Sequence, residues 1–455
     1  MITIRAVWQK KSDTVRLPPF LVPYWQRLQA SPIGYRLAKG AFWSLAGAVI
    51  SRGLGLLASI LVARMLGKVG FGELGIIQST VGMFGVFAGF GLGVTATKHV
   101  AEFRAKDPKK AGRIIALSGI VAIVTGAVMS VALFVFAPWL AEHTLAAPQL
   151  DGLIRIGSLL LFLSALNGAQ TGALAGFEAF RAIAQVNLLA GVAAFPLMVG
   201  GVWLWGTTGA VWALVVSMAI NWLLNHLALR REAARYAIPF TLVEFTREWP
   251  VLLRFALPTF LTSSLVLPAM WACNTMLVNQ PRGYAEMGIL SAAQQWRFPI
   301  IFISGLLTQV GFPVVSERHA LGSDGDVRKL LAAMVKMNCA VALPVMLILV
   351  CFSKQIMGWY GAEFKEGSAC LIFIVGATCL QAIQSPAITV MQATGYAWHN
   401  FLLNLIWCSA LLLGSYFGAI YGAKGLAAAQ LVAFIIYTPF LFITSRRLSR
   451  RACKN

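Results

Sequence analysis

The sequence predicts an all-α integral membrane protein of about twelve transmembrane helices, built as two parallel six-helix repeats around a central cavity. Three observations predict this fold class: an apolar composition, a series of apolar stretches of membrane length, and a motif that recurs in the second half of the chain. Of the 455 residues, 58% are hydrophobic and 12% are charged, whereas soluble domains carry roughly 25% charged residues. We therefore expect lipid to surround most of the chain.

Apolar stretches follow one another along the chain after residue 40. A helix rises about 1.5 Å per residue, so about 20 apolar residues cross ~30 Å of hydrocarbon. Twelve stretches meet this length, at residues 41–66, 74–97, 114–137, 153–174, 183–205, 210–229, 251–278, 285–310, 330–351, 369–393, 401–419 and 426–444. The loops between them are short, so we expect successive helices to be antiparallel.

An internal repeat gives the architecture. Residues 70–76 (GFGELGI) recur as residues 283–289 (GYAEMGI), a shift of 213 residues. Further matches join VAE at 100–102 to VSE at 315–317, a shift of 215, and Gly176-Phe177 to Gly395-Tyr396, a shift of 219. Because six predicted helices separate the copies, both halves enter the membrane from the same side, and such parallel repeats enclose a central substrate site.

The positive charges orient the chain in the membrane. The net charge is +21, with 37 Lys and Arg against 16 Asp and Glu. In a soluble protein this excess would suggest a nucleic-acid partner, but here it gathers in loops on one side, and loop 138–152 on the other side has no Lys or Arg. By the positive-inside rule we expect both termini in the cytoplasm and no nucleic-acid partner.

These features divide the chain into five parts. They are a basic cytoplasmic or interfacial N-terminal segment (1–39), an N-lobe of helices 1–6 (40–229), a basic cytoplasmic linker (230–250), a C-lobe of helices 7–12 (251–445) and a basic cytoplasmic tail (446–455). The N-terminal segment lacks the apolar core of a secretory signal. Tyr24, Trp25 and Arg27 favour a place on the membrane surface, and a disordered tail is the alternative.

No motif indicates a cofactor. The seven cysteines fall mostly inside apolar stretches and show no CxxC spacing, which supports neither a zinc site nor a disulfide framework. The absence of a GxxxxGK[ST] loop argues against direct ATP use. We expect no cofactor, no metal site and no catalytic residue.

The acidic residues argue against one class of transporter. All 16 fall in loops or at the ends of the predicted helices. Exporters that couple cationic drugs to protons or sodium usually rely on a carboxylate buried in the membrane. The sequence offers no obvious residue for that mechanism.

Two arginines do lie within the apolar stretches, Arg52 in the first and Arg297 in the eighth. Each costs about 2.5–3.5 kcal/mol to insert, so each should face a polar cavity or a partner. An external anion is a natural complement, and Gln294, Ser304 and Thr308 extend a polar stripe around Arg297. The alternative is that the arginines snorkel or bind backbone carbonyls at kinks such as Pro299.

Amide side chains are the other candidates for binding. Gln170 and Gln384 lie at corresponding places in the fourth and tenth helices, and Asn274 lies in the seventh. Such groups suit a sugar, but interhelical hydrogen bonds of ~0.6 kcal/mol are an equally ordinary use. The predicted substrate-binding residues are Arg52, Arg297, Gln294, Gln170, Gln384 and Asn274.

Several motifs together resemble one family. They are ARMLG at 63–67 followed by Phe71-Gly72, Lys98 with VAE at 100–102, and Leu174 with Gly176-Phe177. With these, the chain resembles the polysaccharide and O-antigen flippase branch of the multidrug, oligosaccharidyl-lipid and polysaccharide exporter superfamily.

The resemblance implies alternating access by two lobes. It implies transfer of an undecaprenyl-pyrophosphate-linked sugar unit to the outer leaflet of the bacterial inner membrane. By position, Arg52 and Arg297 match the cavity cations that receive the pyrophosphate in relatives. It also implies membrane lipids, a polymerase and glycosyltransferases as partners. We expect a monomer, because the two lobes already supply a paired interface.

Other functions were weighed against this one. A multidrug exporter of the same superfamily is the main alternative, disfavoured by the acids. A polymerase or ligase would need a larger outer loop than residues 138–152 or 353–368 provide. A scaffold protein would not explain arginines within the membrane.

Overall fold

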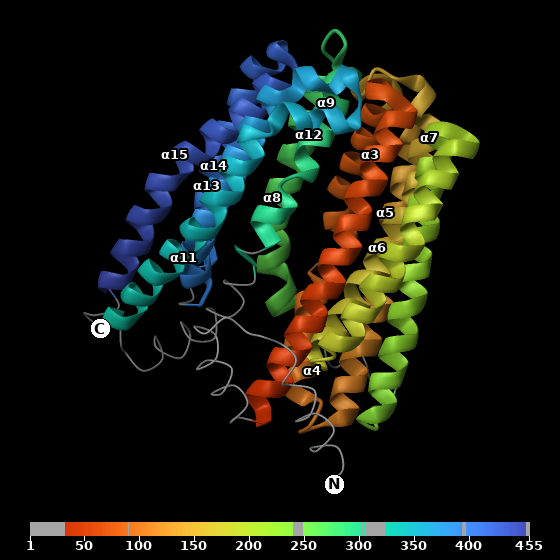
Figure 1. The fold of residues 1–455 in the computed structure, drawn as a ribbon. Coiled ribbons are helices and arrows are strands. Elements are labelled where there is room, and N and C mark those ends of the chain that lie inside the picture. The colour runs from red at the N-terminus through yellow and green to blue at the C-terminus, as the bar shows by residue number, and fades with distance from the viewer. Residues whose placement is uncertain are drawn as a thin grey trace, which may run out of the picture.

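The computed structural model describes residues 32–89, 91–239, 249–302, 304–305, 324–393 and 397–451. Within these ranges every regular element is a helix and there is no strand, which confirms the all-α class (Figure 1). The other residues, including most of the predicted N-terminal segment, much of the linker, Thr308 and the last four residues, lie outside the described ranges.

The N-lobe comprises the elements before the linker. They are α3 (Pro32–Gly89), α4 (Leu92–Phe103), α5 (Pro108–Trp139), η1 (Leu140–Thr144), η2 (Pro148–Leu150), α6 (Asp151–Gly176) and α7 (Phe180–Arg235). The C-lobe comprises α8 (Trp249–Val278), α9 (Gly283–Gln295), α11 (Asp324–Cys351), α12 (Ser353–Tyr360), η4 (Ala362–Gly367), α13 (Ser368–Ala393), α14 (Ala397–Gly418), η5 (Ala419–Tyr421) and α15 (Gly422–Arg451).

Three helical runs turn back on themselves at a glycine. α3 breaks at Gly67 (φ 68°), α7 breaks at Gly206 (φ 56°), and α15 begins at Gly422 (φ 70°). Only glycine adopts such backbone angles readily, so each break sits at the residue that allows it. Of seven described segments apolar and long enough to cross a membrane, three contain one of these breaks. The segments 180–235 and 398–445 each cover two predicted helices. The segment 47–89 covers the first and only the start of the second, predicted at 74–97, whose end lies in α4 after Gly91 (φ 66°).

Helices extend beyond the predicted apolar stretches at their charged ends. α3 begins at Pro32, α7 continues to Arg235, and α15 continues to Arg451. Continuing the helix past the hydrocarbon keeps the backbone hydrogen bonds made, while the charged side chains meet water. Parts of the predicted N-terminal segment, linker and tail are therefore helical.

The predicted eighth helix is interrupted at its middle. α9 ends at Gln295, and the N–H groups of Trp296 and Arg297 donate to the carbonyls of Ala293 and Gln294, each at 3.2 Å. Helix resumes at Phe298. Pro299 accounts for the break, because it has no N–H for the carbonyl of Gln295, four residues earlier, and its ring would clash with that carbonyl in a continuous helix.

The acid of the repeated motif has the same role in both lobes. Glu286 accepts a hydrogen bond from the N–H of Ala423 at 2.7 Å, immediately after the break at Gly422. Glu73 lies beside the side chains of Gln149 and Thr207, the latter immediately after the break at Gly206. Each carboxylate thus lies at the N-terminus of the last long helix of its own lobe, where a negative charge is favourable. The two lobes are built as structural repeats, as predicted.

Candidate functional site

The two lobes approach each other at one end of the molecule. We call the end where α3 begins and α15 ends the terminal end, and the opposite end, which holds the glycine breaks, the far end. Figure 1 shows the lobes close together at the far end and diverging toward the terminal end, with α8 between them.

The repeated motif forms the closest contact between the lobes. A Cβ atom at Gly72 would collide with the carbonyl oxygen of Tyr284, and one at Gly288 would collide with that of Lys68. The backbones of α3 and α9 therefore touch, which requires small residues. The glycines of the motif that revealed the repeat are explained by this crossing at the far end.

Each lobe also donates a side-chain hydrogen bond to a backbone carbonyl of the other lobe. Arg64 Nε donates to the carbonyl of Trp359 in α12 at 2.6 Å, and Tyr284 Oη donates to the carbonyl of Leu145 at 2.7 Å. The acceptors Leu145 and Trp359 are related by a shift of 214 residues, so the two bonds use equivalent carbonyls of the repeat but different donors. Lys68 forms an ion pair with Glu366, which adds a charged contact between the lobes.

Other side chains strengthen the same closure. Phe71 lies 6.3 Å from the rings of both Tyr360 and Phe364, measured between centroids. Asn279 Nδ2 donates to the carbonyl of Thr144 at 2.8 Å. These contacts, with the bonds of Arg64, Lys68 and Tyr284, make up what we call the far-end latch.

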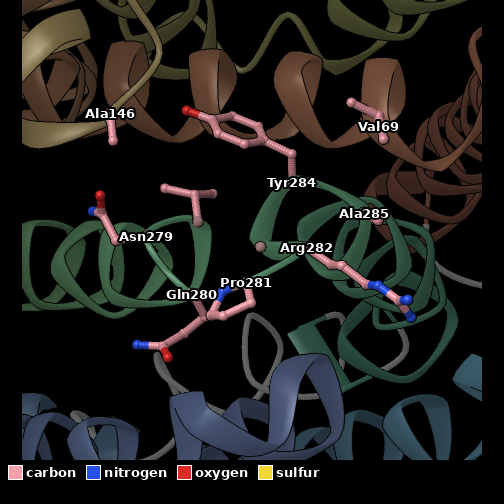
Figure 2. A pocket seen from close by; sticks show the side chains of 10 residues that line it. Val69, Ala146, Asn279, Gln280, Pro281, Arg282, Tyr284 and Ala285 are labelled. Carbon is pink, nitrogen blue, oxygen red and sulfur yellow. The ribbon is translucent and has the colours of Figure 1, made fainter.

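A shallow groove of about 480 Å³ lies beside Tyr284, which belongs to this latch. Figure 2 shows Tyr284 reaching from the C-lobe toward the N-lobe, with Val69 and Ala146 of the N-lobe lining the same groove. The side chain of Arg282 points away from Tyr284. The polar groups that line the groove therefore do not converge on one ligand position.

Asn274, a predicted binding residue, takes part in the contact between lobes. It is 6% exposed, and its Nδ2 donates to Ser79 Oγ at 2.8 Å. One turn earlier Trp271 Nε1 donates to Thr80 Oγ1 at 3.0 Å. Both bonds join α8 to α3.

Arg297 lies at the interruption after α9 and is half-buried. Its Nη2 donates to Gln381 Oε1 of α13 at 2.9 Å. Its Nε is buried and has no hydrogen-bond partner among the described residues. The local break leaves the arginine on a short turn that the neighbouring helix α13 holds in place.

Arg52 contacts the residue next to Arg297 from the other lobe. It is exposed on α3, and its guanidinium lies over the ring of Phe298, 5.0 Å from the centroid. Phe298 directly follows Arg297, so the two predicted cations belong to neighbouring parts of the interface between the lobes. Neither arginine forms an ion pair with a described residue.

The other residues predicted around Arg297 differ in their surroundings. Gln294 is half-buried and its side chain makes no hydrogen bond within the described ranges. Ser304 Oγ donates to the carbonyl of Ala382 at 3.2 Å, so it binds α13. The sequence reasoning missed Gln381 as a partner of Arg297, because only the fold brings α13 to the break.

Gln170 and Gln384 make equivalent bonds within their own lobes. With its amide oriented to satisfy both polar atoms, Gln170 donates to the carbonyl of Trp222 and accepts from Trp222 Nε1, both at 3.1 Å. Gln384, 1% exposed, donates to Thr438 Oγ1 at 2.7 Å and to the carbonyl of Phe434 at 3.2 Å. Each joins the fourth helix of its lobe to the sixth.

Comparison with known proteins decides the family. A family model described as polysaccharide biosynthesis protein matches residues 37–319, more than half of the chain. The chain belongs to the polysaccharide biosynthesis protein family. The resemblance inferred from the motifs is thereby confirmed.

Two relatives of this family member have names that describe their work. It is 25% identical over 409 residues to the EPS I polysaccharide export inner membrane protein EpsE of Ralstonia nicotianae, covering 88% of this chain and 91% of that protein. It is 25% identical over 185 residues to the lipid III flippase of Escherichia coli K12, covering 36% of this chain and 44% of that protein.

Solved structures share the fold over both lobes of the family member. An inward-facing multidrug resistance MATE family transporter of the MOP superfamily has a TM-score of 0.76 at 15% identity, covering 90% of this chain and 99% of that one. The outward-facing conformation of such a transporter has a TM-score of 0.69 at 16% identity, with coverages of 92% and 97%. The lipid II flippase MurJ, inward closed, has a TM-score of 0.69 at 16% identity, with coverages of 89% and 87%.

Proposed function

We propose that this protein is a flippase for surface polysaccharide synthesis. It moves a polyprenyl-pyrophosphate-linked oligosaccharide from the cytoplasmic to the outer leaflet of the bacterial inner membrane by alternating access. The pair formed by Arg52 and Arg297 carries the proposal: the two cations come from different lobes, Arg52 contacts Phe298 next to Arg297, and neither has a carboxylate partner in the described structure. Family membership and the export and flippase relatives support it.

The distribution of charge supports the orientation. The basic residues 98–113, 230–235 and 446–451 all belong to the terminal end, so we place this end and both termini in the cytoplasm. The far end, where the latch closes the lobes, then faces outward. The conformation is inward-facing, in keeping with the higher TM-score to the inward-facing transporter.

The chemistry of a pyrophosphate suits the two arginines. A guanidinium binds phosphate oxygens through two parallel N–H donors, which a lysine cannot do. Arg297 Nε has no hydrogen-bond partner among the described residues, and Arg52 is exposed on α3 over the neighbouring Phe298. One phosphate would bind to each lobe, so the head group would link the lobes while it crosses.

The remaining candidate residues divide by their contacts. Gln294 is half-buried near the arginines, and we assign it to the sugar or phosphate. Gln170 and Gln384 hold helices together inside each lobe, and Asn274 holds α8 to α3. We assign these three a supporting role in the shape of the cavity.

Transport needs the far-end latch to open when the terminal end closes. Moving a negative charge outward from an inside-negative cell gains about 2.3 kcal/mol per charge per 100 mV. The membrane potential alone would therefore favour the outward step. The proposed activity is transport and not catalysis. The proposed partners are the lipid-linked sugar and membrane lipids, together with a polymerase and glycosyltransferases of the same pathway. The proposed functional unit is a monomer.

The test is complementation of a strain that lacks the native gene. We expect deletion to leave lipid-linked sugar on the cytoplasmic leaflet and to abolish polymer, and the wild-type gene to restore both. Arg52→Ala and Arg297→Ala should insert normally and restore polymer at least about tenfold less well, since each loses a charge-assisted pair worth about 1.5–3 kcal/mol.

Arg155→Ala is the matched control. Arg155 also lies on a membrane helix and over an aromatic ring, Phe134 at 5.2 Å, but it is paired with Asp151. It should restore polymer like the wild type. Unchanged polymer and leaflet distribution after deletion, with greater sensitivity to cationic drugs, would replace the flippase with the drug exporter.

A further inference from the structure

We propose that Gln381 determines the charge selectivity of the site, by holding Arg297 in place without neutralising it. This inference rests on the proposed function, since it concerns the group that would meet the pyrophosphate. Gln381 reaches Arg297 from α13, a different helix, with 2.9 Å between its Oε1 and Arg297 Nη2. It is a specificity-determining residue that acts through the arginine.

The chemistry of an amide explains the selectivity. A neutral carbonyl oxygen fixes one guanidinium nitrogen and leaves the positive charge intact. A carboxylate in its place would form a charge-assisted pair with the guanidinium and cancel that charge. Arg297 Nε is buried and has no partner among the described residues, so the guanidinium keeps a donor that its contacts there do not satisfy.

The repeat shows that this arrangement belongs to one lobe. Gln381 corresponds to Asn167 at a shift of 214 residues, the shift that also relates Gln170 to Gln384. Asn167 accepts from Asn225 Nδ2 at 2.9 Å and donates to the carbonyl of Met218 at 3.2 Å. By the same shift, the counterpart of Arg297 is Met83.

The two copies of this amide position therefore do different work. In the N-lobe the amide joins helices α6 and α7, while in the C-lobe it holds a half-buried cation. This difference supplies a matched control, because an acid can be placed at either position of the repeat.

The experiment measures binding of inorganic pyrophosphate to purified full-length protein in nanodiscs of uncharged lipid, by isothermal titration calorimetry. We expect Gln381→Glu to weaken binding at least about tenfold, and Asn167→Asp to stay within about twofold of the wild type. Gln381→Leu keeps the cation and should lose less than Gln381→Glu does.

A charge exchange separates selectivity from folding. Arg297→Gln should abolish binding, and the double variant Arg297→Gln with Gln381→Arg should restore part of it, because the cation returns to the same place from α13. Equal losses for Gln381→Glu and Gln381→Leu, or no rescue by the double variant, would overturn the inference.

The failure of the proposed function looks different. If the wild type binds pyrophosphate and Gln381→Glu does too, only the role of Gln381 is wrong, and the flippase still stands on the complementation test. If the wild type binds no pyrophosphate, both the anion site and the selectivity of Gln381 are overturned.

Discussion

Single residues in this chain show how the same position serves two lobes. Glu73 and Glu286 occupy equivalent places in the repeated motif, and each binds the N-terminal turn of the last long helix of its lobe. The sequence places both acids at helix ends, and the structure shows what they bind there. Asn167 and Gln381 occupy equivalent positions of the repeat but make different contacts, because only the C-lobe has an arginine beside the amide.

Removing the Glu286 carboxylate should destabilise the C-lobe. Glu286→Ala leaves the N–H of Ala423 without its acceptor, and the loss of such a cap costs about 0.5–2 kcal/mol. We expect a lower midpoint of thermal unfolding in detergent, and a smaller decrease for Glu286→Gln, which keeps an acceptor oxygen. Glu363→Ala, an exposed acid on the same face of the protein, should leave the midpoint unchanged.

At the scale of elements, packing of α3 against α9 decides whether the far end can close. The crossing depends on two glycines, each of which lets the backbone of one lobe touch a carbonyl of the other. The predicted eighth helix is interrupted for an equally local reason, the proline after Phe298. Elements thus set both the closure at the far end and the turn that carries Arg297.

A methyl group at the crossing should open the far end. Gly72→Ala or Gly288→Ala would press a Cβ against a backbone carbonyl, which cannot rotate away as a side chain can. We expect the population to shift toward the outward-open state, measured as longer spin-label distances between α3 and α12 at the far end. In Gly82→Ala, a change on the same helix where the new Cβ meets no atom within 4 Å, the distances should match those of the wild type.

At the scale of the whole molecule, two lobes that touch at one end can open that end and close the other. The latch is reciprocal, since Arg64 binds the carbonyl of Trp359 and Tyr284 binds the carbonyl of its repeat equivalent, Leu145. The latch includes the exposed ion pair between Lys68 and Glu366, and exposed ion pairs contribute about 0–1 kcal/mol to stability. A latch of this strength can hold the far end closed without preventing its opening.

Locking the latch should stop transport. Replacing Lys68 and Glu366 by cysteines places two thiols where the ion pair lies, in a background without the exposed Cys351. We expect an oxidant to crosslink the lobes and abolish restoration of polymer, and a reductant to recover it. Undiminished transport by fully crosslinked protein would contradict alternating access through this end.

The sequence by itself determined the all-helical membrane class, the two repeats and the family, because each follows from local composition, from membrane-length apolar runs or from short motifs. It also identified Arg52 and Arg297, since a cation within an apolar stretch stands out in one dimension. Only the tertiary structure placed Arg52 against Phe298, next to Arg297, joined Gln381 to Arg297, and turned Gln170, Gln384 and Asn274 into interhelical contacts. An amide within the membrane can bind a ligand or a neighbouring helix with the same chemistry, so its partner depends on which helices the fold makes neighbours.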